Sequence, residues 1–186
     1  KDAVYPHMRN VIAGIKQSAS QLWTGHFDTE TRFATNNPLY ADVLDIDSLY
    51  LWVEERGGGE PQHASELARI DSGRMLLQLD QSYEHDVPHA ADNENAQWIR
   101  RKNYAGLLSG CAGTSFCPGA RGNPLYTFKH WRTLMDTTGM AEAGHLFAVF
   151  ESRPWHTLTP DRDHKLIVAG PGQREPESID YVAAAL

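Results

Sequence analysis

Short apolar runs alternate with amphipathic segments along the chain, and this alternation predicts its secondary structure. Apolar side chains at three- and four-residue spacing are typical of helices with one buried face. Such spacing predicts helices at Pro6–Lys16, Pro61–Ile70, Thr127–Met135 and Met140–Phe150, and one that begins at an N-cap on Asp92 and stops at Gly110. Runs bounded by polar or turn-forming residues predict strands at Gln21–Phe27, Val43–Trp52, Met75–Leu79 and Ala112–Cys117.

Alternating helices and strands of this kind predict an α/β fold with a parallel sheet, either a βα-barrel or an open sheet. The count gives four βα units, whereas a complete barrel has eight in about 250 residues. A half barrel would leave an open sheet edge and part of its core uncovered, so we expect the chain to be a piece of something larger. After Arg153 the rhythm stops, and two short strands are expected at Lys165–Ala169 and Asp180–Ala184.

Charge and composition narrow the class of protein. The 186 residues carry a formal net charge of −7, and no basic cluster is larger than Arg100–Lys102, which argues against a nucleic-acid partner. No apolar run approaches the roughly 18 residues that span a bilayer. The two cysteines, Cys111 and Cys117, would lie up to about 20 Å apart in a strand, so we expect free thiols.

The polar cluster Asp80–Asp86, directly after the Met75–Leu79 run, is where we expect chemistry. Active sites of parallel barrels lie at the carboxyl ends of the strands. Glu84 is the candidate, although carboxylates at strand ends are often N-caps, turn formers or salt-bridge partners. His85, Asp86 and His89 also suggest a metal site, but nine histidines are scattered along the chain, and we expect no metal or other cofactor.

Several short motifs, taken in order, resemble the apiosidase-like glycoside hydrolases. These are bacterial (β/α)8-barrel enzymes followed by a small β-sandwich. The matching pieces are Asn10–Lys16, Thr24-Gly25-His26, Leu44-Asp45-Ile46, Tyr83-Glu84, the series Arg100, Tyr104, Leu107, Leu108, Gly110 and Gly113, and Arg153-Pro154-Trp155 with Leu158, Pro160 and Asp161. The match covers most of the chain, and its specificity comes from the order and spacing of the pieces.

The resemblance implies that residues 1–153 form the second half of a TIM barrel and that residues 154–186 begin a β-sandwich. It implies a hydrolase of plant or microbial polysaccharides, secreted or periplasmic, in which Glu84 is one of two catalytic carboxylates, most plausibly the nucleophile after strand seven. The partner acid follows strand four, upstream of Lys1, so the other half of the barrel or another chain would supply it. The implied substrate-binding residues are His26, Asp45, Tyr50, Tyr83, His85 and Trp155.

Each of these residues also has an ordinary structural interpretation. His26 fits a satisfied core histidine, Asp45 fits a partner for an arginine, and Tyr83 and Trp155 fit simple packing as well as stacking on a sugar ring.

The sequence departs from the family pattern close to the expected sugar site. Tyr50 and Val53 stand where Gln and His are common, His85 replaces a Gly, and Gly113–Cys117 differs from the strand-eight signature. These departures leave two alternatives open. One is a non-catalytic carbohydrate-binding or assembly component that reuses the scaffold, and the other is a redox or metal enzyme that uses His26, Asp28 and His85.

Overall fold

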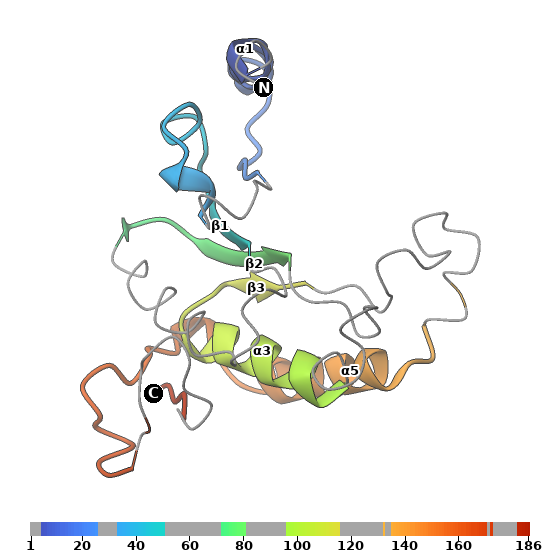
Figure 1. The fold of residues 1–186 in the computed structure, drawn as a ribbon, viewed down its shortest axis with the longest axis vertical. Helices are drawn as coiled ribbons and strands as arrows, with labels where there is room; N and C mark the ends of the chain where they lie inside the picture. The colour runs from blue at the N-terminus through green and yellow to red at the C-terminus, as the bar shows by residue number, and fades with distance from the viewer. Residues whose placement is uncertain are drawn as a thin grey trace.

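The computed structural model describes most of the chain, and its elements are those of an α/β protein. The described residues are 5–25, 33–50, 72–80, 96–115, 132, 135–170, 172 and 182–186. Their helices are α1 (Tyr5–Lys16), α3 (Ala96–Leu108) and α5 (Thr138–Glu151), with short 3-10 turns η1 (Ala34–Asn36) and η4 (Trp155–Thr157). Figure 1 shows α1 at one end of the molecule and α3 and α5 at the other, with the strands between them.

The strands β1 (Asp47–Tyr50), β2 (Leu76–Asp80) and β3 (Gly113–Thr114) form a parallel sheet in the order β1-β2-β3. Leu77 of β2 stands opposite Ser48 on one side and Gly113 on the other. The sheet is parallel, as the alternation of elements predicted, and its strands follow one another in chain order. Its apolar core is a cluster of four buried side chains, Phe33, Leu49, Leu76 and Cys111.

The helix α3 connects β2 to β3, and its end is set by Gly110, as the sequence predicted. Gly110 has a φ of 96°, a left-handed conformation that favours glycine. The N–H of Cys111 donates to the carbonyl of Gly106 at 3.0 Å, and the N–H of Gly110 donates to that of Leu107 at 3.2 Å. These two bonds are a Schellman C-cap, which satisfies the last carbonyls and turns the chain back into β3. Cys111 is buried and takes part in no disulfide, as expected, whereas Cys117 lies outside the described residues.

The contact between α3 and β2 is unusually close because Gly106 has no side chain. A Cβ built on Gly106 would lie 2.1 Å from Nε2 of Gln78. That amide is 2% exposed, and its Nε2 donates to the carbonyl of Lys102 on the same helix at 3.3 Å. Gln78 thus places a hydrogen-bonding group in the interface between the strand and the helix.

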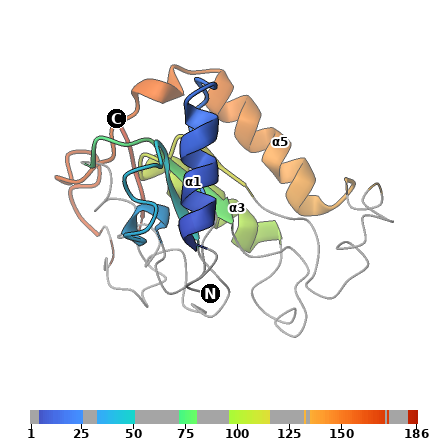
Figure 2. The same ribbon diagram turned by 90° about the horizontal axis from the view of Figure 1, so that it is seen from above.

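The helix α5 packs alongside α3, as Figures 1 and 2 both show. Its N-cap is Thr137, whose side chain accepts the N–H of Met140 at 3.4 Å. An ion pair between Arg100 Nη1 and Glu142 Oε1 at 2.5 Å joins the two helices. The predicted helix at Met140–Phe150 is confirmed, with bounds slightly wider than expected.

The predicted helix near the N-terminus is also confirmed, but its apolar stripe is mostly exposed. Ile12 packs with Val43 against a buried cluster of Ala34, Tyr40 and Leu44, whereas Met8, Val11 and Ile15 remain in contact with solvent. Polar contacts with the segment after η1 hold α1 in place instead. Arg9 pairs with Asp42, and Lys16 donates to the carbonyl of Val43 at 2.9 Å.

One predicted strand is absent in its described part, and another is shorter than predicted. Residues 21–25 form no strand, because the carbonyl of Trp23 accepts N–H groups from both Asp45 and Ile46 in an irregular crossing. The strand predicted at Val43–Trp52 is confirmed only for Asp47–Tyr50, with residues 51 and 52 outside the described part.

Lys165–Ala169 is likewise no strand. The carboxylate of Asp161 accepts the N–H groups of Lys165, Leu166 and Ile167 at 2.6–3.0 Å, and these donors are no longer available for a sheet. The antiparallel pairing found near the C-terminus joins Pro160 to Ala185, with Thr159 and Leu186 exchanging backbone hydrogen bonds at 2.7 and 2.8 Å.

The close contact at Gly106 predicts opposite effects for two glycine-to-alanine substitutions in helices. Gly106→Ala should lower the free energy of unfolding, because overpacking costs about 1–3 kcal/mol and exceeds the gain in helix propensity of about 1 kcal/mol. Gly14→Ala is the matched control, since nothing lies within 4 Å of the position that a methyl group on Gly14 would occupy in α1. It should stabilise by up to about 1 kcal/mol.

Urea unfolding of the two variants measures this difference. Equal or greater stability of Gly106→Ala relative to Gly14→Ala would show that α3 does not approach β2 in this way.

Candidate functional site

The carboxyl ends of the three strands lie along one edge of the sheet, because parallel strands point the same way. β1 ends at Tyr50, β2 at Asp80 and β3 at Thr114. The register between β1 and β2 shifts after Leu49, so that Tyr50 stands opposite Asp80. Irregularities of this kind are frequent beside active sites, where they redirect a strand end. This edge is where the sequence predicted chemistry.

The predicted site residues are described to different extents. Tyr50 has its backbone at the carboxyl edge. Four candidates lie outside the described residues, namely Glu84, His26, Tyr83 and His85. Asp45 and Trp155 are described in full. Neither side chain lies at the carboxyl edge of the sheet.

Asp45 is engaged in a structural contact rather than presented to a substrate. Both its carboxylate oxygens lie 2.7 Å from Nζ of Lys16, and Oδ2 accepts the N–H of Trp23 at 3.0 Å. The hydrogen bond from Lys16, followed by that from Trp23, lowers the pKa of Asp45 below its ordinary value of 3.8. The sequence predicted Asp45 either in the site or beside an arginine, and its partner is a lysine on α1.

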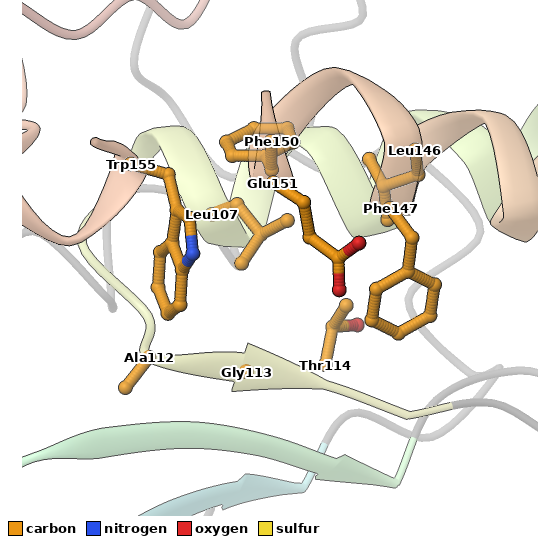
Figure 3. Close-up of a pocket in the computed structure, with 9 residues that line it drawn as sticks. All are labelled: Leu107, Ala112, Gly113, Thr114, Leu146, Phe147, Phe150, Glu151 and Trp155. Carbon is orange, nitrogen blue, oxygen red and sulfur yellow. The ribbon is translucent and has the colours of Figure 1, made fainter. Parts of the chain in front are cut away.

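Trp155 lies near the amino end of β3, not at the carboxyl edge. It follows α5 in η4, and its indole stands beside Ala112, the residue before β3 (Figure 3). The sequence predicted that Trp155 contacts the substrate, and that role stays a prediction, while the structure places the indole away from the carboxyl edge. The helix α5 ends at Glu151 and the short turn after it carries Trp155 back over the start of β3.

Trp155 belongs instead to a pocket between α5 and β3 with a volume of about 220 Å³. Figure 3 shows the Trp155 indole on one side and the Phe147 ring on the other, with the Glu151 carboxylate between them, directed toward Thr114. The nine lining residues are Leu107, Ala112, Gly113, Thr114, Leu146, Phe147, Phe150, Glu151 and Trp155. Most of the lining is apolar, and Glu151 is its charged member.

The rear of the pocket is held by the packing of α5 on α3. Leu146 and Phe150 are buried, and the Phe150 ring packs on that of Tyr104 with centroids 5.9 Å apart. On the floor, Thr114 Oγ1 donates to Oδ1 of Asn103 at 2.6 Å, which ties β3 to α3. The front of the pocket is open, with Phe147 60% exposed.

Sequence reasoning missed Phe147 and Glu151 as site residues, although a signal was present. Phe147, Glu151 and Trp155 are four residues apart, a spacing that keeps the first two on one face of a helix. The apolar periodicity alone gives Phe147 a role in helix packing, and its high exposure argues against that role.

Other classes of site have no support in the described residues. These contain no group of three or more His, Cys, Asp or Glu side chains that could hold a metal ion. None of the helices in the described part of the chain has the length and apolarity that a bilayer span requires.

Comparisons of the chain with protein-family models, with curated proteins and with solved structures yield no match.

The contact of Asp45 with Lys16 predicts a pH-dependent contribution to stability. Because the pKa of Asp45 is lower in the folded protein, its stabilising effect is present above the unfolded value near 3.8 and is lost as the pH falls through the lowered one. Asp45→Asn should therefore unfold at lower urea concentration than the wild type at pH 7, and the gap should close below about pH 4.

Asp163→Asn serves as the control, since Asp163 is exposed and pairs only with Lys165 at 3.3 Å among the described contacts. It should change the urea midpoint little at either pH. A stability difference for Asp45→Asn that is the same at pH 7 and pH 3 would contradict an ionised, paired Asp45.

Proposed function

We propose that the chain is part of a glycoside hydrolase that acts on plant or microbial polysaccharides, with Glu84 as one of its two catalytic carboxylates. The second carboxylate would come from outside residues 1–186. What supports the proposal is the position of Glu84 in the sequence, four residues after Asp80, the last residue of the central strand β2. In parallel α/β enzymes the segment after a strand's carboxyl end carries the chemistry.

The strand order is compatible with a barrel. In the described part of the chain β1, β2 and β3 are neighbours in chain order, with α3 as the crossover between β2 and β3. Each half of a doubly wound sheet has the same consecutive order, so the family resemblance is what favours the barrel. Consecutive parallel strands are the arrangement of one side of a (β/α)8 barrel, in which β2 and β3 would be strands seven and eight.

The C-terminal residues fit a connection to a second unit. The antiparallel pairing of Thr159–Asp161 with Ala184–Leu186 departs from the parallel arrangement before it. We assign residues 154–186 to the beginning of an appended β-domain on this basis.

The proposed reaction needs two carboxyl groups with different roles. One protonates the glycosidic oxygen as that bond breaks, and the other attacks the anomeric carbon or activates a water molecule. We assign Glu84 the nucleophilic role, so that a glycosyl ester forms on its carboxylate and water then releases the sugar. This two-step route requires a separation of about 5–5.5 Å between the two carboxyl groups, compared with about 6.5–9.5 Å for direct attack by water.

The residues proposed to contact the sugar are now a smaller set. His26, Tyr50, Tyr83 and His85 remain candidates around Glu84. Asp45 is removed from the set by its contact with Lys16, and Trp155 by its place at the amino end of β3.

Replacement of Glu84 tests the proposal. In the protein that carries both carboxylates, Glu84→Gln keeps the shape of the side chain and removes its charge. Turnover of aryl glycosides and polysaccharides should fall by about three orders of magnitude or more, while binding of the oligosaccharide product persists in calorimetry. Asp163→Asn, which removes an exposed acid elsewhere, should leave turnover unchanged.

Azide distinguishes the nucleophile from the acid. In Glu84→Gly, azide should occupy the vacated space and attack the anomeric carbon, which restores turnover and yields a glycosyl azide. Near-normal turnover in Glu84→Gln would refute the assignment. Sugar binding by a wild type that hydrolyses no glycoside would favour the non-catalytic carbohydrate-binding alternative.

A further inference from the structure

Glu151 presents a negative charge in the pocket of Figure 3 that no cation neutralises within the described structure. It is the last residue of α5, whose final turn contains no basic residue. A carboxylate at a helix C-terminus is disfavoured by the partial negative charge of the terminal carbonyls. Arg153 is the nearest cation along the chain, but its Nη1 donates to the carbonyl of Val149 at 2.5 Å and to Oγ of Ser152 at 2.9 Å. Glu151 therefore contributes nothing evident to the stability of α5.

Aromatic rings flank that charge. The Trp155 indole and the Phe147 ring stand on opposite sides of the Glu151 carboxylate (Figure 3), and Phe150 closes the rear. The negative face of an aromatic ring attracts a cation, and tryptophan does so most strongly. A carboxylate together with aromatic and aliphatic walls attracts a ligand that is both positively charged and apolar, which excludes hydrated metal ions and anions.

The size of the pocket sets the size of the ligand. Its volume of about 220 Å³ is below the range of roughly 300–1,000 Å³ for drug-sized ligands. A compact ammonium group that carries methyl or other short alkyl groups fits this space. A net charge of −7 also favours the approach of a cation.

We propose that the pocket between α5 and β3 binds a small alkylated ammonium ion, with its charge against Glu151 and its alkyl groups against Trp155 and Phe147. The ligand class is that of choline and related quaternary amines. The charged group that contacts the ligand is the Glu151 carboxylate. Selectivity therefore rests on charge and on the aromatic walls rather than on a network of hydrogen bonds.

Choline and its neutral isostere 3,3-dimethylbutan-1-ol test this site. The two have nearly the same shape, and only choline is charged. Calorimetric titration of the full chain, at ionic strength held constant with sodium chloride, should give saturable binding of choline in the millimolar range. The neutral alcohol should bind at least about fivefold more weakly, the factor that corresponds to about 1 kcal/mol.

Three variants assign the effect to the pocket. Glu151→Gln should weaken choline binding at least about fivefold and leave the alcohol unaffected. Trp155→Leu keeps an apolar wall but removes the aromatic face, so it should weaken choline more than the alcohol. Asp163→Asn removes the same charge from an exposed residue that does not line the pocket, and it should change neither affinity. Circular dichroism and urea unfolding check that each variant is folded.

Three results would overturn the proposal. These are the absence of saturable choline binding, equal affinity for choline and the alcohol, and undiminished choline binding by folded Glu151→Gln. Choline binding and glycoside hydrolysis are measured separately, so the loss of one function leaves the other standing.

Discussion

The close packing of α3 on β2 is the contact on which the described fold depends. Gly106 lets the helix approach until the Gln78 amide lies where a Cβ would be, and that amide is hydrogen-bonded to Lys102. Because α3 connects β2 to β3, the position of α3 on β2 also sets the face of the sheet from which the chain enters β3. The parallel direction of β3, the edge at which all three strands end and the space between β3 and α5 follow from this arrangement.

The sequence predicted the elements whose signals are local and strong. The run before Asp80 predicted β2, and Gly110 marked the C-cap of α3 correctly because a left-handed turn favours glycine whatever the surroundings. One error arose where a side chain accepts hydrogen bonds from the backbone. Asp161 accepts three N–H groups that a strand at Lys165–Ala169 would have needed, and no periodicity of apolar residues reveals such a contact.

Two carboxylates show why candidate sites are harder to predict than elements. Asp45 looked functional because it follows an apolar residue in a predicted strand, yet Lys16, 29 residues earlier, neutralises it. Glu151 was not predicted as a site residue, yet it stands between two aromatic side chains in a pocket. The partner of Asp45 comes from a different part of the chain, and its position depends on the fold. The aromatic neighbours of Glu151 are close to it in sequence, but the wall that β3 adds to the pocket also depends on the fold. The proposed role of Glu84 rests on a relation that sequence can supply, its distance from the end of β2.

The parallel pairing of β2 on both sides is the central claim, because it sets the edge from which the segment with Glu84 departs. Nuclear Overhauser contacts between backbone protons test it most directly. The account predicts amide-to-α-proton contacts that link Leu77 with the region of Ser48 on one side and of Gly113 on the other. Close contacts between α protons across either pair, the mark of antiparallel strands, would contradict it.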